Sequence, residues 1–397
     1  MKSLRELYRI GHGPSSSHTM GPYRAAELFR SRPAAVSAAR FEVELRGSLS
    51  ATGRGHFTDR AVQEALGSDR VSIVWNDEPL PAHPNGMVFR AFGADGAKID
   101  EWMVYSIGGG AISESGAAEP TPEVYPYADM AEMLELCRNE GIQLWQIVDR
   151  HEGPGIWDYL EQVRVTMNET VERGLATTGV LPGGLKLPRH ARELFLKARA
   201  LRADLQRTGL VAAYAYAANE ENASLGLMVT APTCGASGTL PAALRYVQQT
   251  NRDSDEEIRR ALAVAGLFGN VAKQNGSISG AEAGCQAEVG VACAMASAAV
   301  AYLFGGTSGQ IETAAESGLE HFLGLTCDPV MGLVQIPCIE RNAVAANRAI
   351  VAAELALLSD GRHVVSYDAV VQAMLATGHD LPSLYRETSK GGLCKVL

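Results

Sequence analysis

Residues 117–126 read Ala-Ala-Glu-Pro-Thr-Pro-Glu-Val-Tyr-Pro, and this proline-rich stretch separates two parts of the chain with different hydrophobic patterns. Three prolines within seven residues remove backbone donors and interrupt helices and strands alike. A chain of 397 residues is also long for a single hydrophobic core. The sequence therefore predicts an N-terminal domain at 1–116, a linker at 117–127 and a C-terminal domain at 128–397.

The part before the linker combines helix and strand patterns. A helix is expected from Gly21-Pro22 onward, because proline suits the first turn of a helix. Polar and apolar residues follow strand-like patterns at 40–46, 71–75, 87–92 and 99–105. The connections between the last strands are too short for crossover helices, so we expect a mixed or antiparallel sheet. The predicted class is α+β.

The part after the linker is dominated by helical spacing, and strand signals almost vanish. Glycine and proline breaks at 182–184, 232–238, 305–308 and 329–332 separate the helical stretches. The sequence predicts an all-α domain. Its expected helices lie at 129–138, 156–173, 189–206, 255–268, 281–304 and 343–358.

Charge and composition exclude several classes of partner. The chain has 35 Lys and Arg against 45 Asp and Glu, a formal net charge of −10, which argues against nucleic acid and anionic membranes. Its first residues lack the apolar core of a signal peptide, and the most apolar stretch, 289–305, reads as a buried helix. Seven cysteines, an odd number, favour the reducing cytoplasm and metal or catalytic duty over disulfides.

Three cysteines, Cys285, Cys327 and Cys338, lie next to or near glycine or proline rather than in ordinary core helix. Thiolates are soft ligands that suit iron–sulfur clusters, zinc or copper, and three of them leave one corner of a four-metal cluster open. The alternative is a small buried hydrophobic residue, which we assign to Cys137 and Cys293 on apolar helical faces. The spacings are too wide for a zinc knuckle or a ferredoxin run, so the residue pattern leaves both interpretations open.

Two loops in the N-terminal part carry hydroxyl and imidazole groups. Residues 11–22 hold three serines, a threonine and two histidines just before the predicted helix, where backbone N–H groups attract carboxylates or phosphates. Residues 47–59 follow the first strand and contain His56, which can act as an acid or base near neutral pH. For both loops the alternative is plain helix capping.

Taken together, these segments closely resemble the iron–sulfur-dependent L-serine dehydratases of bacteria. The resemblance runs nearly end to end, and in that family an α/β domain precedes a helical catalytic domain. The motifs that carry it lie at 11–22, 47–59, 105–110, 179–186, 230–241, 277–292, 327–342 and 386–393.

The resemblance implies a [4Fe–4S] cluster held by Cys285, Cys327 and Cys338, with its fourth iron open to the hydroxyl of L-serine. A base would remove the α-proton as hydroxide leaves, and the product would become pyruvate and ammonia. His18 and His56 match the family's histidines with suggested acid–base roles. The hydroxyls expected to bind the substrate carboxylate and amino groups belong to Ser15, Ser16, Ser17, Thr19 and Thr58.

Several positions depart from the family pattern. Phe57 stands where the family has glycine after the histidine, so it narrows or reorients that loop, and Arg54 replaces a common lysine. Cys234 stands where many members have asparagine, and Ser237 where they have cysteine, so Cys234 is expected to line the site without binding the cluster. Some members have a tail cysteine that occupies the open iron. Cys394 either does this or is a plain terminal cysteine.

Other readings remain open from the sequence. The same chemistry could act on L-threonine or another β-hydroxy amino acid, and a serine-binding sensor with a closed structural metal site is a non-enzymatic alternative. A pyridoxal phosphate lyase would need a Schiff-base lysine, and none of the candidates has that cofactor's setting. These candidates are Lys186, Lys197, Lys273 and Lys390. We expect a cytoplasmic homodimer whose partner is the small molecule L-serine.

Overall fold

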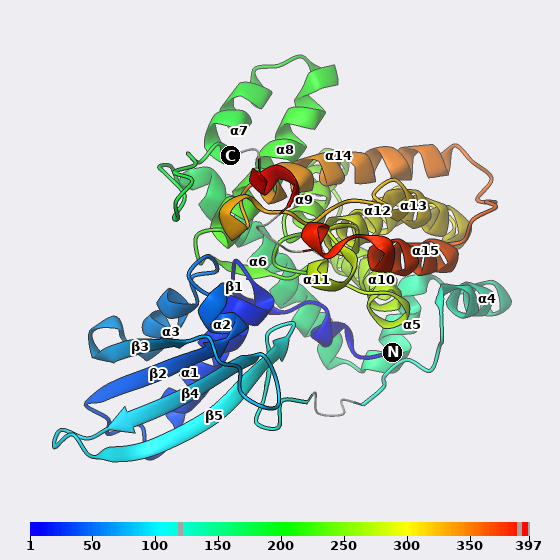
Figure 1. The fold of residues 1–397 in the computed structure, drawn as a ribbon. Helices are drawn as coiled ribbons and strands as arrows, with labels where there is room; N and C mark the ends of the chain where they lie inside the picture. The colour runs from blue at the N-terminus through cyan, green and yellow to red at the C-terminus, as the bar shows by residue number, and fades with distance from the viewer. Residues whose placement is uncertain (118–121, 387–390, 396–397) are drawn as a thin grey trace. The chain divides into compact units, whose positions relative to one another are not determined.

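The computed structural model describes residues 1–117, 122–386 and 391–395. The chain packs as two compact units, one of residues Gly11–Thr121 and one of residues Met1–Ile10 with Pro122–Leu397. We call them the N-terminal unit and the helical unit, and Figure 1 shows the strands of the first and the helices of the second.

The N-terminal unit is built on a five-stranded sheet in the order β3-β2-β4-β5-β6. β2 pairs in parallel with β3 and antiparallel with β4, and β5 continues antiparallel to both of its neighbours. The mixed sheet predicted from the sequence is therefore confirmed. The strands are β2 (Arg40–Gly47), β3 (Val71–Asn76), β4 (Asn85–Phe92), β5 (Lys98–Gly108) and β6 (Ala111–Ser113).

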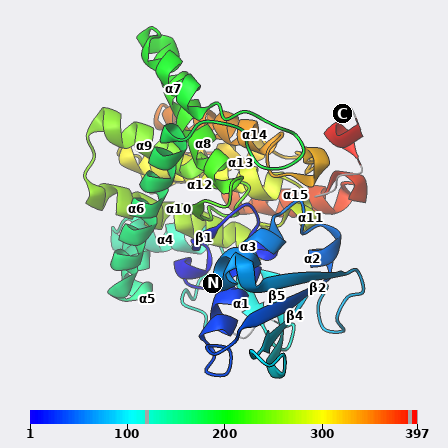
Figure 2. The same ribbon diagram turned by 90° about the vertical axis from the view of Figure 1, so that its left-hand side faces the viewer.

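Two helices cover one face of this sheet, α1 (Gly21–Ser31) and α3 (Thr58–Leu66), with the short α2 (Ser48–Ala51) between β2 and α3 (Figure 2). Apolar side chains of β2 and β4 alternate toward these helices, and Phe29 of α1 packs 5.3 Å from Phe89, measured between ring centroids. The other face is polar: Arg90 makes ion pairs with acidic side chains of β2 and β5. One buried and one polar face explain the alternation seen in the sequence.

The helical unit is centred on α12 (Val291–Leu303), which packs against the helices that surround it, as Figure 1 shows. By length and composition Gln286–Leu303 could cross a membrane, but 83% of this window is buried inside the protein, as in the core helix of a soluble fold. The helices packed most closely against α12 are α9 (Thr239–Asn251), α10 (Asp255–Asn275), α13 (Ser308–Glu320) and α14 (Cys338–Leu357). The other helices of the unit are α4 (Met130–Glu140), α5 (Leu144–Glu152), α6 (Gly155–Ala176), α7 (Ala191–Arg199), α8 (Ala203–Asn222), α11 (Gly280–Ala283) and α15 (Tyr367–Asp380).

The helical character predicted after the linker is confirmed, but two predicted helices are divided. The stretch 189–206 forms α7 and α8, which are separated at 200–202. The stretch 281–304 begins with α11 and continues through a π-helical turn, Gln286–Gly290, before α12 starts. Gly284 has a φ of 74°, a left-handed conformation that ends α11 and that glycine adopts without strain.

The first ten residues belong to the helical unit. The amino group of Met1 donates to the carbonyl of Tyr125, and the hydroxyl of Tyr8 donates to the carbonyl of Leu262. Thr230, which follows the short strand β7 (Leu227–Val229), donates its hydroxyl to the carbonyl of Leu7. These buried hydrogen bonds hold the N-terminal segment on the helices. β1 (Ile10–His12) then begins the passage into the N-terminal unit.

Candidate functional site

The three cysteines predicted as ligands lie at interruptions of the helical unit. Cys285 follows Gly284 and precedes the π-helical turn Gln286–Gly290, and its N–H donates to the carbonyl of Leu325. Cys327 lies in the loop after α13, where its N–H donates to the carbonyl of Tyr385. Cys338 is the first residue of α14. Glycine and proline end regular helix at these points, as the sequence suggested.

The structure brings the three thiols together. A hydrogen bond with the Cys327 thiol is the main reason that the pKa of Cys285 falls to about 7, and Arg341 assists while burial opposes it. Burial raises the pKa of the Cys338 thiol, and the nearby Cys285 and Glu288 add to this effect. Cys285 and Cys327 are buried, whereas Cys338 remains partly exposed to solvent. Three soft donors from three distant segments thus share one region.

The donor set consists of thiols, the soft ligands that iron–sulfur clusters use. Among the described residues, no group of three or more His, Cys, Asp or Glu side chains is arranged to hold one metal ion. A zinc site needs its ligands around a single centre, at about 2.3 Å for sulfur, whereas thiolates of a four-iron cluster each bind a different iron. Cys285, Cys327 and Cys338 supply three thiols, the ligand type that such clusters use, and Cys285 interacts with each of the other two.

Arg341 is the cation of this region, and the sequence reasoning missed it. Its guanidinium is hydrogen-bonded to the Cys285 thiol, donates to the carbonyl of Thr326 at 2.6 Å and lies 3.5 Å from a carboxylate oxygen of Asp328. Positive charge beside sulfur favours the thiolate form that binds metal. Its position three residues after Cys338, one turn along α14, was the available signal.

Glu288 is a second residue that the sequence reasoning missed. It belongs to the π-helical turn after Cys285, and its Oε1 accepts a 2.8 Å hydrogen bond from the hydroxyl of Thr233. The Cys327 thiol lies 3.7 Å from its Oε2. The surrounding protein, and then the charge of Cys285, raise the pKa of this carboxyl to about 7. Cys234, next to Thr233, is buried, and its pKa is raised by burial and by Glu288.

Cys394 lies against the loop that carries Cys327. Its thiol donates to the carbonyls of Asp328 and Pro329 at 3.2 and 2.9 Å. The N–H of Leu393 donates to the carboxylate of Asp328 at 2.8 Å. The tail residues just before this segment, 387–390, lie outside the described residues. The structure therefore places the tail cysteine beside a predicted ligand loop, on backbone acceptors.

In the N-terminal unit the serine-rich loop forms a π-helical turn, Ser16–Met20, directly before α1. The hydroxyl of Ser15 accepts from the N–H of His18, and Ser106 of β5 donates its hydroxyl to the carbonyl of Ser17 at 2.6 Å. Ser15, Ser16 and Ser17 remain partly exposed. Hydroxyls and N–H groups at the start of a helix are the setting in which carboxylates bind.

Two reciprocal hydrogen bonds join this loop to the second one. Thr19 donates its hydroxyl to the carbonyl of His56 at 2.7 Å, and Thr58 donates to the carbonyl of His18 at 2.5 Å. Both threonines are fully buried. They are therefore structural links between the two loops, while the three serines keep the accessible hydroxyls. This separates the five predicted substrate hydroxyls into two roles.

The two histidines lie side by side, with ring centroids 4.8 Å apart. His18 places Nδ1 2.9 Å from the hydroxyl of Ser17 and Nε2 3.0 Å from that of Ser48. His56 places Nδ1 3.2 Å from the carbonyl of Thr52, which can only accept, so Nδ1 carries the proton and Nε2 holds the lone pair. Burial lowers the pKa of His56. Burial, and then His56, lower the pKa of His18 to about 3, so both rings are neutral at neutral pH.

The residue that departs from the family glycine has a left-handed backbone. Phe57 has a φ of 56°, a conformation that costs a residue with a side chain about 1 kcal/mol or more. Its ring is buried, and the guanidinium of Arg60 lies 5.5 Å from the ring centroid. Arg54 stacks over Trp75, 4.1 Å from its centroid. The two side chains that differ from the family pattern, Phe57 and Arg54, thus each pack in a contact between a guanidinium and an aromatic ring.

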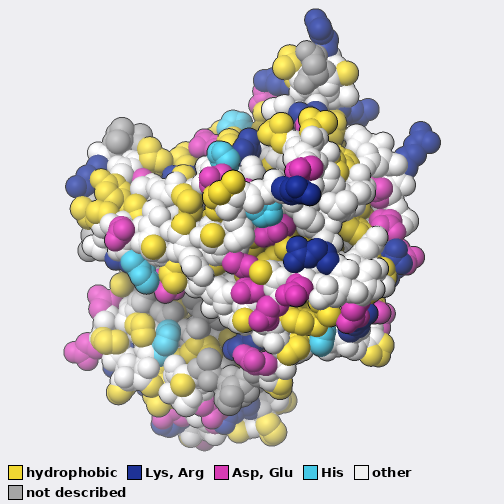
Figure 3. All heavy atoms as spheres, turned by 90° about the vertical axis from the view of Figure 1, so that its right-hand side faces the viewer, with side chains coloured by type: hydrophobic (Ala, Val, Ile, Leu, Met, Phe, Trp, Pro, Cys, Tyr) yellow, Lys and Arg dark blue, Asp and Glu magenta, His cyan; other side chains and the backbone are white. Residues whose placement is uncertain are grey.

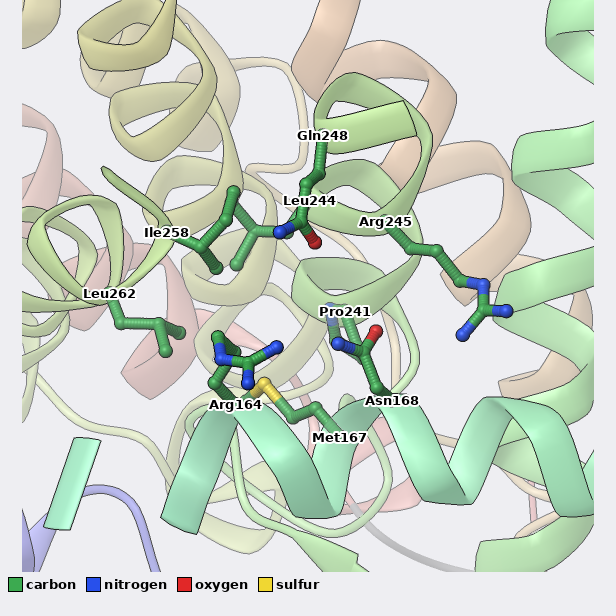
Figure 4. A pocket seen from close by; sticks show the side chains of 9 residues that line it. All are labelled: Arg164, Met167, Asn168, Pro241, Leu244, Arg245, Gln248, Ile258 and Leu262. Atoms are coloured by element: carbon green, nitrogen blue, oxygen red, sulfur yellow. The ribbon is translucent and has the colours of Figure 1, made fainter. Parts of the chain in front are cut away.

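A separate cavity in the helical unit does not belong to the site. It lies among α6, α9 and α10 and measures about 10 Å³, enough for a single water molecule (Figure 4). Arg164, Met167 and Leu244 are among its lining residues, and none of the predicted site residues is. The surface view in Figure 3 shows acidic and basic side chains interspersed, with no broad face of one charge on the side it presents.

Comparison with known proteins matches both parts of the chain. A family model described as serine dehydratase alpha chain matches residues 128–394, and one described as serine dehydratase beta chain matches residues 3–74 and 66–117. An L-serine dehydratase of Streptomyces coelicolor is 40% identical over 98% of this chain and 98% of its own length. L-serine dehydratase 1 of Escherichia coli is 39% identical over 99% and 98%, and an L-serine dehydratase of Helicobacter pylori is 35% identical over 100% and 99%.

Proposed function

We infer that this chain, which belongs to the serine dehydratase family, converts L-serine to pyruvate and ammonia. The curated relatives that support this substrate match the chain over nearly its whole length. No relative named above supports L-threonine as the substrate, a sensor role or pyridoxal phosphate chemistry.

The observation that carries the proposal is the gathering of three thiols from distant segments beside one guanidinium. We propose that Cys285, Cys327 and Cys338 hold a [4Fe–4S] cluster and that Arg341 offsets the negative charge of the thiolates. When bound, the cluster supplies a Lewis-acidic iron that makes the β-hydroxyl of serine a better leaving group. The partial exposure of Cys338 gives a small molecule access to this region.

The proton chemistry is assigned to the N-terminal unit. His56 is the proposed base, because its Nδ1 is committed to the carbonyl of Thr52 and its neutral Nε2 can accept the α-proton. His18 stays neutral and serves as a hydrogen-bonding partner. As the proton leaves Cα, the electron pair forms the Cα–Cβ double bond and hydroxide departs. The resulting aminoacrylate tautomerises and takes up water to give pyruvate and ammonia.

The five hydroxyl residues divide between binding and support. We propose that the accessible serines of the loop, Ser15, Ser16 and Ser17, bind the substrate carboxylate, aided by the helix end. Thr19 and Thr58 are proposed to act on the substrate only indirectly, by holding the two loops together. This narrows the set of direct substrate contacts that the sequence suggested.

Cys394 is proposed to occupy the open metal position until serine displaces it. Its thiol already lies on the backbone of residues 328–329, immediately after Cys327. Cys394→Ala should leave the cluster assembled but change the activation lag or the sensitivity to air. Unchanged kinetics on both counts would reduce Cys394 to a plain terminal cysteine.

The working form is proposed to be a cytoplasmic homodimer that needs no nucleic acid or membrane. The net charge of −10 and the absence of a broad face of positive charge in Figure 3 are consistent with that setting. Analytical ultracentrifugation of the purified chain measures the oligomeric state directly, and a monomer at enzyme concentrations would contradict this part of the proposal.

The main experiment is anaerobic purification followed by iron analysis, visible absorption and serine turnover. The expected product is a brown protein that releases pyruvate from serine and loses activity in air. Alanine substitutions at each of the three thiols should abolish activity and iron binding, while Cys293→Ala, a change to a buried core thiol on α12, should spare both. A colourless protein with full activity would end the cluster proposal.

A further inference from the structure

Glu288 occupies an unusual place for an acidic side chain. It lies on the π-helical turn directly after Cys285, with Oε2 3.7 Å from the thiol of Cys327. That thiol donates a hydrogen bond to Oε2, but as a metal-bound thiolate it would no longer donate, and the carboxylate would then lie beside negative charge. Such a placement is costly for folding, and it is the kind of cost that persists at sites built for a ligand.

The carboxylate of Glu288 accepts hydrogen bonds from the Thr233 hydroxyl and the Cys327 thiol, but it forms no ion pair among the residues that the structure describes. Thr233 fixes Oε1 through a neutral hydroxyl at 2.8 Å. The nearby cation, Arg341, directs its guanidinium to the carbonyl of Thr326, to Asp328 and to Cys285. Asp328, by contrast, forms an ion pair with that guanidinium and accepts a hydrogen bond from the N–H of Leu393. Asp328 thus has a direct ion pair, whereas the charge of Arg341 reaches Glu288 only through space, as the smallest of the effects on its pKa.

The position of Glu288 is closely fitted and still reachable. A methyl group on Gly280 would come within 2.6 Å of Oε2 and 3.2 Å of the Cys327 sulfur, so only glycine leaves both groups in place. Glu288 is enclosed by protein but keeps some solvent exposure, as Cys338 does. A small polar molecule that reaches the thiols therefore also meets this carboxylate.

A bound amino acid supplies the missing charge. L-serine carries its β-hydroxyl and its α-ammonium on adjacent carbons, so a hydroxyl directed to the thiol-held metal brings the ammonium close to the same sulfurs. We propose that Glu288 binds the α-ammonium of the substrate and thereby selects amino acids over hydroxy acids that lack this ammonium group. This assignment rests on the proposed function, and it makes Glu288 a specificity-determining residue in the helical unit.

The test measures how the substitution Glu288→Gln changes the binding of ligands that carry an ammonium group and of ligands that lack one. We expect this variant to keep the iron content and visible absorption of the wild type. Its KM for L-serine should rise about 30-fold or more, because a charge-assisted contact is lost. Calorimetric binding of L-alanine, which has the ammonium but no leaving group, should weaken by a similar factor. Inhibition by 3-hydroxypropionate, which lacks the ammonium, should change less than about threefold.

Two further variants keep the test decisive. Glu316→Gln on α13 makes the same change at another buried acidic side chain, whose neighbours are Glu320 and His363, and it should leave all three constants unchanged. Thr233→Val keeps the Glu288 carboxylate but removes its orienting hydroxyl, so it should raise the KM for serine by only about threefold to tenfold.

The possible failures point to different conclusions. The ammonium assignment would be overturned if Glu288→Gln weakened the binding of serine and 3-hydroxypropionate equally, or if it left the KM for serine and the binding constant of alanine unchanged. It would also be overturned if the variant lost only kcat, or if it lost its iron. A wild-type enzyme that leaves serine unchanged would overturn the proposed function instead. The two results are distinguished because the wild type is measured first.

Discussion

His18 and His56 in the N-terminal unit are surrounded by hydroxyl and carbonyl groups, whereas Cys285 in the helical unit lies against the guanidinium of Arg341. The first environment lowers the pKa of both imidazoles and keeps them neutral. In the second, a hydrogen bond with the Cys327 thiol, assisted by Arg341, lowers the pKa of the Cys285 thiol to about 7 and favours its anion. A neutral imidazole can accept a proton and a thiolate can bind a metal, so these opposite electrostatic environments suit different parts of the proposed elimination.

The largest effect is expected from the neutral histidines of the N-terminal unit. His56→Gln removes the proposed proton acceptor and should lower kcat by about 10²–10⁴-fold, because this is the range that a positioned base contributes. Iron content should stay unchanged. The measurement is steady-state pyruvate release by anaerobic enzyme, with His18→Gln beside it. A smaller loss in His56→Gln than in His18→Gln would exchange the roles of the two rings.

Removing the positive charge of Arg341 tests the helical unit, the other half of this comparison. Arg341→Gln leaves the buried Asp328 carboxylate without its guanidinium, so the free energy of unfolding should fall by about 3 kcal/mol or more and iron loading should drop. Chemical denaturation and iron analysis measure both. Arg348→Gln, on the same helix, changes an arginine hydrogen-bonded to Ser317 and serves as the control. Similar iron loss in both variants would mean that charge beside the thiols is not the cause.

The links between the two loops of the N-terminal unit should have an intermediate effect. Thr58→Val leaves the carbonyl of His18 without its hydroxyl donor, which should cost about 1–3 kcal/mol of stability. Thr52→Val removes an exposed hydroxyl contact to the carbonyl of Ser48 and should cost less. Thermal unfolding compares the two variants. Equal stabilities would show that the buried link contributes nothing beyond an ordinary surface hydrogen bond.

The smallest effect concerns acid. The ordinary pKa of a histidine is 6.5, and burial lowers that of His18 to about 3. Between these values the unfolded chain binds the extra proton, so this contribution to stability is complete above about pH 6.5 and is lost as the pH falls toward about 3. Tm measured at about pH 7.5 and about pH 5 should fall with acid, and less steeply in His18→Gln. The same slope in both proteins would remove His18 from this effect.

Local patterns in the sequence were sufficient for much of the fold. Alternating residues at 40–46 and 71–75 predicted β2 and β3, because one face of the sheet is buried and the other is wet. Several elements were not predicted, including β6, which has only 3 residues, and the helices α5, α9, α13 and α15. The break between α7 and α8 was missed as well, because residues 200–202 carry neither glycine nor proline.

The residues of the candidate site also include some that the sequence predicted and some that it did not. The cysteines and the loop serines were found because their residue types are rare or clustered. Arg341 and Glu288 belong to common types, and what distinguishes them is contact with thiols more than 50 residues away in one case and nearly 40 in the other. The reciprocal Thr19 and Thr58 links join positions about 40 residues apart. Such pairings depend on tertiary structure and leave no periodic signal.

Both segments that carry the proposed chemistry enter their helices through a π-helical turn, Ser16–Met20 before α1 and Gln286–Gly290 before α12. Such a turn holds one residue more than a regular helical turn. A single inserted codon in an ordinary helix start is therefore enough to create either arrangement, and a single deleted codon would undo it.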